Sequence, residues 1–162
     1  MFSFNFRENI YLVAEKTKKD VGPVTILVNN AGIVSGTSLL DTPDSKIVKT
    51  FEVNVLAHFW TIKVRKESLH FPMFLLQAFL PDMLKHKLGH VVNVASMAGQ
   101  SGTNKLVDYC SSKFAAVGLD EAFRAELFVQ GHSDYIKTTV VCPYYISTGM
   151  FAGVQVLCCF SK

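Results

Sequence analysis

Tyr109 and Lys113, four residues apart in the stretch DYCSSKF, are the side chains of this sequence best placed for proton chemistry. On a helix this spacing puts both side chains on one face, one turn apart. A cation beside a phenol favours the phenolate, so we expect the pKa of Tyr109 to fall below its usual value of about 10. The phenol would then exchange a proton near neutral pH. The pair alone is a weak signal, because short spacings recur by chance.

The composition is that of a globular domain. A chain of 162 residues, 49% hydrophobic and 18% charged, has the length of a single domain and is expected to bury a hydrophobic core. The net charge of +3 is spread over isolated residues, which argues against a nucleic-acid partner. The 4 cysteines have no CxxC spacing, so they indicate a reducing compartment and neither a disulfide framework nor a metal site.

Predicted strands and helices alternate along the chain. The apolar runs VTILV and HVVNVA are typical of strands buried on both faces of a parallel sheet. We predict the end of a strand over 2–6, strands over 24–28, 90–95 and 136–142, and helices over 8–19, 42–63 and 107–129. This order predicts an α/β fold, with a parallel sheet covered by helices on both faces.

Turn and cap residues set the element boundaries. Gly22 ends the first helix, and Thr42 is predicted to be the N-cap of the second. Parallel sheets of this kind bind ligands at the carboxyl ends of their strands. Those ends are expected at 29–32, 95–99 and 142–148, and the helix that carries Tyr109 begins shortly after the second of them.

The residues at these ends resemble the motifs of the short-chain dehydrogenase/reductase family. NNAG at 29–32 is similar to the motif after the family's fourth strand, and DYCSSKF contains its YxxxK pair. Four further matches, in the family's order, are Asn54, Asn93, Ser96 and Thr148. The stretches LLDTPDSKI, NVLAHFWTIK and IKTTVVCPYYISTGMF are similar to the epidermal retinol dehydrogenase branch.

This resemblance implies catalytic and cofactor-binding roles. Tyr109 would act as general acid/base, and Ser96 would hydrogen-bond the substrate oxygen. Lys113 would lower the phenol pKa and hold ribose hydroxyls, and Asn54 would reach Lys113 through a water molecule. The implied cofactor-binding residues are Asn30, Ala31, Gly32, Lys113 and Thr148. For Ser96, Asn54 or Thr148 taken singly, a cap or turn role is an open alternative.

By the same resemblance, the reaction is hydride transfer between a nicotinamide cofactor and an apolar alcohol or aldehyde, with retinol and retinal favoured. NAD and NADP both stay open, because the residue that reads the ribose 2′ position has no counterpart. The relatives form homodimers and carry an apolar anchor at the endoplasmic reticulum membrane. These 162 residues show no such anchor, so a cytoplasmic location is the alternative.

The sequence departs from the family in its first part. The glycine-rich turn TGxxxGxG, which binds the cofactor pyrophosphate at a helix N-terminus, has no match. We therefore expect residues 1–162 to form a single incomplete dinucleotide-binding domain, a partial Rossmann-like doubly wound parallel sheet that lacks its first strands. The strand at 24–28 would then have an unpaired apolar edge, which predicts poor solubility.

Two further departures concern the middle and the end. Residues 64–77 look like an insertion, and Pro72 predicts a helix break near His70 and Phe71, which puts the family's dimer in doubt. The chain ends soon after Thr148, without the relatives' substrate-covering segment. A catalytically silent fragment that associates with related full-length chains is therefore the alternative function. A membrane-surface role for the apolar residues 71–80 is a third hypothesis.

Overall fold

The computed structural model describes residues 4–63, 79–146 and 149, and its centre is a three-stranded parallel sheet. The strands are β1 (Ile26–Asn29), β2 (Gly89–Val94) and β3 (Ile136–Val141), in the order β1-β2-β3. Asn29 lies opposite Asn93, and Val94 lies opposite Val141. The parallel α/β architecture predicted from the alternating pattern is confirmed, with each strand within two residues of its predicted bounds.

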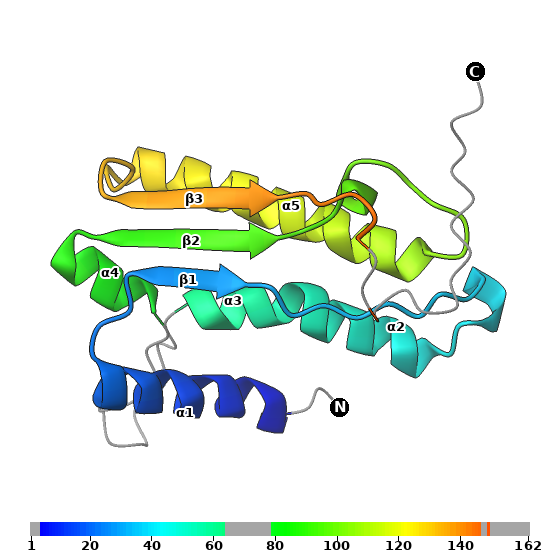
Figure 1. Cartoon of the computed structure of the whole chain (residues 1–162), viewed down its shortest axis with the longest axis horizontal. Coiled ribbons are helices and arrows are strands. Elements are labelled where there is room, and N and C mark those ends of the chain that lie inside the picture. The colour runs from blue at the N-terminus through cyan, green and yellow to red at the C-terminus, as the bar shows by residue number, and fades with distance from the viewer. Residues whose placement is uncertain (1–3, 64–78, 147–148, 150–162) are drawn as a thin grey trace.

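The helices also follow the predicted order (Figure 1). They are α1 (Phe4–Val21), α2 (Asp44–Phe51), α3 (Ala57–Ile62), α4 (Leu80–His86) and α5 (Val107–Val129). The predicted bounds of α5 are confirmed. The strand predicted over 2–6 is wrong for residues 4–6, which belong to α1. A helix pairs its own backbone groups and needs no neighbouring strand there.

One long helical stretch joins α2 to α3 through a π-helical segment, Glu52–Leu56. The prediction of Thr42 as its N-cap is wrong, since Pro43 holds that position. The Thr42 hydroxyl instead donates to the carbonyl oxygen of Ser38 at 2.7 Å, in the 3-10 turn that precedes the helix, η1 (Leu39–Asp41). The insertion at 64–77 and its predicted break lie outside the described residues.

The helices cover only one face of the sheet in the described part of the chain. Side chains of α3, α4 and α5 pack on the inward residues of the strands, and the core they form contains Leu27, Ile62, Met83, Val91, Leu119, Leu127 and Ile136. In β1, the residues of the opposite face, Ile26 and Val28, are 62% and 56% exposed. The prediction that the strand is buried on both faces is therefore wrong for these residues of β1.

The charge and hydropathy of the described helices bear on membrane insertion. In residues 4–63 and 79–146, no helix combines the length and the apolar character that crossing a bilayer requires.

Candidate active site

The carboxyl ends of the three parallel strands meet at one edge of the sheet, and most of the predicted site residues lie there. Asn30 follows β1, Ser96 comes two residues after the end of β2, and Cys142 follows β3. Parallel pairing places these three positions side by side, because all three strands end in the same direction. The same edge receives the first turns of α5.

A short turn holds Ser96 against α5. This turn, η3 (Met97–Gly99), begins at Ser96, whose hydroxyl accepts a hydrogen bond from the N–H of Ala98 at 3.1 Å. Gly99 approaches α5 so closely that a Cβ at this position would lie 2.6 Å from the carbonyl oxygen of Lys113. Only glycine fits this backbone contact, which sets the distance between Ser96 and α5.

Tyr109 and Lys113 lie on one buried face of α5, with 4% and 3% of their surfaces exposed. The ammonium nitrogen of Lys113 is 5.7 Å from the centroid of the Tyr109 ring and donates a hydrogen bond to the carbonyl oxygen of Val94 at 2.9 Å. The side chain of Ser96 is hydrogen-bonded to Tyr109. The structure thus brings Ser96, Tyr109 and Lys113 together at the end of β2.

Burial dominates the electrostatics of this cluster. It raises the pKa of Tyr109 above its usual value of 10.0, and the hydrogen bond with Ser96 acts in the opposite direction. It lowers the pKa of Lys113 to about 8, against an opposing effect of Cys142. The expected lowering of the Tyr109 pKa is therefore wrong for this structure. Removal from water disfavours the charged forms of both groups.

Asn54 lies in the π segment and joins three parts of the chain. Its Oδ1 accepts a hydrogen bond from the N–H of Ile33 at 2.8 Å. Its Nδ2 donates to the carbonyl oxygen of Ile33 and to Ser112 Oγ, each at 2.9 Å. Both amide protons are therefore in use, and the side chain ties the loop after NNAG to α5. The connection through water to Lys113 that the resemblance implies for Asn54 stays a prediction.

Asp108, the residue before Tyr109, is a buried clamp that sequence reasoning missed. Its Oδ1 accepts a hydrogen bond from Ser35 Oγ at 2.7 Å, and its Oδ2 accepts one from Thr50 Oγ1 at 2.9 Å. The carboxylate thereby joins the first turn of α5 to α2 and to the loop after β1. An acidic residue in a first helical turn is expected from the helix dipole alone, so the sequence carried no specific signal for this clamp.

A buried row of polar side chains crosses the sheet beneath the site. Thr61 Oγ1 lies 2.7 Å from Asn29 Oδ1, Asn29 Nδ2 donates to Asn93 Oδ1 at 2.9 Å, and Asn93 Nδ2 donates to Asp120 Oδ1 at 2.8 Å. Asn29 and Asn93 are also register partners of β1 and β2. The row fixes the register of the two strands, and with it the distance between NNAG and Ser96. Of these residues, sequence reasoning had named Asn93, as a match to a family motif, and Asn29, as part of NNAG.

The remaining predicted cofactor residues lie on the loop after β1 or outside the described residues. Asn30 and Ala31 are exposed and Gly32 is half-buried. This arrangement leaves the NNAG backbone accessible at the carboxyl edge of the sheet. Thr148 lies outside the described residues.

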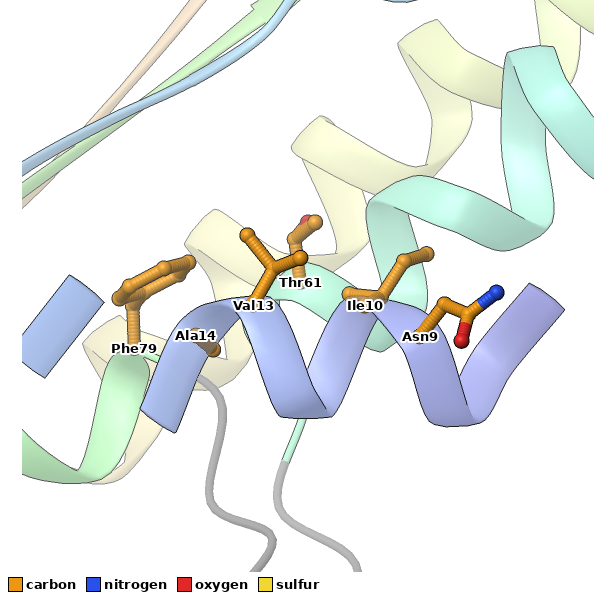
Figure 2. Close-up of a pocket in the computed structure, with 6 residues that line it drawn as sticks. All are labelled: Asn9, Ile10, Val13, Ala14, Thr61 and Phe79. Carbon is orange, nitrogen blue, oxygen red and sulfur yellow. The ribbon is translucent and has the colours of Figure 1, made fainter. Parts of the chain in front are cut away.

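A separate pocket lies between α1 and α3, away from this cluster (Figure 2). Its volume is about 370 Å³, and Figure 2 shows its lining: Asn9, Ile10, Val13, Ala14, Thr61 and Phe79. The lining is mostly apolar and includes none of the predicted site residues. The pocket therefore belongs to the packing of α1 on α3 rather than to the candidate active site.

Comparison with known proteins identifies the family. A profile described as short chain dehydrogenase matches residues 3–156. The chain belongs to this family of oxidoreductases. The chain also superposes on a solved short chain dehydrogenase/reductase from Burkholderia phymatum in complex with NAD, with a TM-score of 0.77 and 26% identity, over 90% of this chain and 47% of that one.

Curated relatives are considerably longer than this chain. It is 49% identical over 152 residues to human epidermal retinol dehydrogenase 2, which is 94% of this chain and 44% of that protein. It is also 49% identical over 150 residues to human retinol dehydrogenase 10, covering 93% of this chain and 40% of that protein. The chain thus spans less than half the length of these relatives.

Proposed function

We propose that this chain carries the catalytic half of a short-chain dehydrogenase that transfers hydride between NAD or NADP and an apolar alcohol or aldehyde, with retinol and retinal as favoured substrates. The observation that carries the proposal is the convergence of Ser96, Tyr109 and Lys113 in one buried cluster. The names of the curated relatives support the retinoid substrate.

The described residues fit the nicotinamide-ribose end of such a cofactor. Lys113 has three N–H donors, and the one given to Val94 leaves others for ribose hydroxyls. The exposed loop at Asn30–Gly32 would pass the adenosine part. Within the described ranges, none of the helices α2 to α5 begins on a glycine-rich turn, so the pyrophosphate site would be supplied by other residues.

The bound cofactor would supply or accept the hydride, and this chain's residues would handle the proton. In the reducing direction, the Tyr109 hydroxyl donates its proton to the substrate oxygen, and in the oxidising direction the phenolate removes it. Ser96 holds that oxygen by a hydrogen bond within reach of Tyr109. The raised pKa keeps the Tyr109 phenol protonated at neutral pH, so the proton needed in the reducing direction is present, but it also makes the phenol a weaker acid.

The test is a titration of NADH and NADPH against the purified chain, followed by cofactor fluorescence. We expect saturable binding that weakens about 10- to 100-fold in Lys113→Ala, because hydrogen bonds from a charged group contribute about 1.5–3 kcal/mol. Lys137→Ala, an exposed lysine of β3, is the matched control and should bind as the wild type does. Tyr109→Phe should retain binding and lose reduction of all-trans-retinal.

A catalytically silent fragment is the second candidate. The observation behind it is the exposure of the outer residues of β1. Absence of binding at millimolar NADH and NADPH would support this candidate over the first. Association with a full-length relative would then be measured by co-purification of the two chains.

We propose the endoplasmic reticulum membrane as the location, on the resemblance to the retinol dehydrogenase branch, with the cytoplasm as the alternative. Fractionation of cells that express the tagged chain separates the two. Recovery in the soluble fraction would overturn the membrane assignment.

A further inference from the structure

Asp120 is a buried acidic side chain that the proposed mechanism does not use. It lies on α5 and is 1% exposed. Among the described residues, no lysine, arginine or histidine forms an ion pair with it. Burying a carboxylate without a cation is costly, so the hydrogen bonds that compensate for the burial indicate what this carboxylate does.

Both oxygens of the Asp120 carboxylate accept hydrogen bonds from the sheet. Oδ1 accepts one from Asn93 Nδ2 of β2 at 2.8 Å, and Oδ2 accepts one from Thr138 Oγ1 of β3 at 3.4 Å. An ionised carboxylate has no proton to donate. Asn93 must therefore turn its NH₂ group towards Asp120 and its carbonyl oxygen away from it. The charge of Asp120 thus decides how the amide of Asn93 is oriented.

This orientation is passed along the buried polar row. The carbonyl oxygen of Asn93 can only accept, and it accepts from Asn29 Nδ2 at 2.9 Å. The carbonyl oxygen of Asn29 in turn faces the Thr61 hydroxyl, 2.7 Å away. All three side chains therefore donate in one direction, towards Asp120. The Thr61 hydroxyl also lies 2.9 Å from another acceptor, the carbonyl oxygen of His58, so its own end of the row is compatible with either direction.

The bond between Asn93 and Asp120 is one of two adjacent links between β2 and α5. Asn93 is followed by Val94, whose carbonyl oxygen accepts the hydrogen bond from Lys113 at 2.9 Å. Lys113 and Asp120 are seven residues apart on α5, about two turns, and therefore share one helix face. The two links together fix the helix against the strand, and with it the position of the buried cluster at the end of β2.

We propose that Asp120 is a positioning residue of the candidate active site. Its charge sets the direction of the buried row, and its bond to Asn93 holds α5 at a fixed position against β2. Hydrogen bonds in a row polarise one another, so a charge at one end strengthens the whole row. The inference rests on the proposed function, and Asp120 acts through Asn93 rather than on the reacting atoms.

The direction of the row is tested by NMR scalar couplings across hydrogen bonds, which join a donor ¹⁵N to the ¹³C of its acceptor. The wild type should show couplings from Asn93 Nδ2 to Asp120 Cγ and from Asn29 Nδ2 to Asn93 Cγ. Asp120→Asn keeps the shape of the side chain, but its amide group accepts or donates. The reverse coupling, from Asn93 Nδ2 to Asn29 Cγ, should therefore appear in this variant.

The control is Glu121→Gln, which removes a negative charge from the next, exposed residue of α5. It should keep the single direction of the wild type. A reverse coupling in the wild type would overturn the proposal. A single, unchanged direction in Asp120→Asn would also overturn it, because the direction would then be set elsewhere.

The positioning role is tested by titration of NADH against the folded variants. Asp120→Leu removes the acceptor, so α5 loses one of its two links to β2, and binding should weaken at least about 5-fold, the lower end of usual couplings between separate sites. Asp120→Asn keeps a hydrogen bond to Asn93 in either direction and should restore most of the affinity. Unchanged affinity in Asp120→Leu, or equal weakening in both variants, would overturn the positioning role.

The two measurements keep this inference apart from the proposed function. The couplings need no cofactor, so they decide on Asp120 even if the wild type binds no NADH or Asp120→Leu does not fold. Absence of NADH binding by the wild type would refute the proposed function. A reverse coupling confined to Asp120→Asn would then still establish Asp120 as the residue that directs the row.

Discussion

His58 and Lys113 are side chains that ordinarily carry or readily gain a positive charge, and both are buried within the helical side of the sheet. Their pKa values are lowered to about 4 and about 8, in each case chiefly by burial. At Lys113, desolvation exceeds the opposing effect of Cys142, whereas at His58 the charge of Lys113 acts in the same direction as desolvation. Lys113 keeps most of its charge at neutral pH and loses it as the pH rises through 8, so binding that depends on the ammonium should weaken in that range.

Titration of His58 should make the stability of the chain pH-dependent. The unfolded state binds more protons than the folded state between the two pKa values, 6.5 and about 4. The contribution of the neutral His58 ring to the unfolding free energy is therefore fully present above pH 6.5 and is lost as the pH falls towards 4. We expect the loss to reach about 3 kcal/mol at 1.36 kcal/mol per pKa unit.

The measurement is urea denaturation of the wild type and His58→Leu at several pH values from 7 to 4. Subtracting the two curves removes the contribution of the carboxylates, which both proteins share. The difference should change with pH only through this window. A constant difference from pH 7 to 4 would show that His58 does not titrate as the structure indicates.

Removing the Asp108 carboxylate should destabilise the chain. Asp108→Ala loses hydrogen bonds to Ser35 and Thr50 and leaves the Thr50 hydroxyl buried without this partner. We expect a loss of about 2–4 kcal/mol in unfolding free energy, because hydrogen bonds to charged groups contribute about 1.5–3 kcal/mol each. Asp108→Asn should lose less, since its oxygen still accepts one hydroxyl. Equal losses in Asp108→Ala and Asp108→Asn would contradict the role of Asp108 as a clamp. Glu121→Ala, on the exposed face of α5, is the control and should leave the unfolding free energy nearly unchanged.

At the scale of elements, the contact between η3 and α5 sets the geometry of the site. Gly99→Ala places a Cβ against the backbone carbonyl of Lys113, and a backbone contact is not relieved by a side-chain rotation. Overpacking of this kind costs about 1–3 kcal/mol. Gly102→Ala, which meets nothing within 4 Å, is the matched control and should leave the unfolding free energy nearly unchanged.

The same substitution should also separate Ser96 from Tyr109. The hydrogen bond with Ser96 lowers the Tyr109 pKa, so its loss should raise that pKa further. NMR of ¹³C-labelled tyrosine measures this shift directly. A Gly99→Ala protein with wild-type stability and an unchanged Tyr109 pKa would show that η3 adjusts freely.

At the scale of the whole molecule, the uncovered face of the sheet should drive self-association. Ile26 and Val28 lie on the face opposite the described helices, together with the half-exposed Val141. Contiguous exposed apolar surface beside an edge strand favours association. We expect oligomers in dilute buffer by analytical ultracentrifugation, reduced in Val28→Lys. Val129→Lys, at another exposed valine, is the control, and equal reduction in both variants would implicate general charge rather than this face.

Much of the architecture was predictable because it depends on local patterns. The spacing of apolar residues predicted α5 and placed the three strands to within two residues, and the alternation of elements predicted parallel pairing. Thr42 was misassigned because its hydroxyl had a competing carbonyl, that of Ser38. The coverage of β1 was misjudged because an apolar run does not reveal which segments fold against it.

The sequence by itself determined which residue types reach the carboxyl edge of the sheet, since element order and motif spacing are properties of the chain alone. Only the tertiary structure decided the electrostatics there, including the raised pKa of Tyr109 and the buried, unpartnered ring of His58. It also decided the partners of Asn54 and Asp108, which come from residues far apart in the sequence. The physical reason is that desolvation and hydrogen bonding depend on three-dimensional packing, which spacing along the chain does not encode.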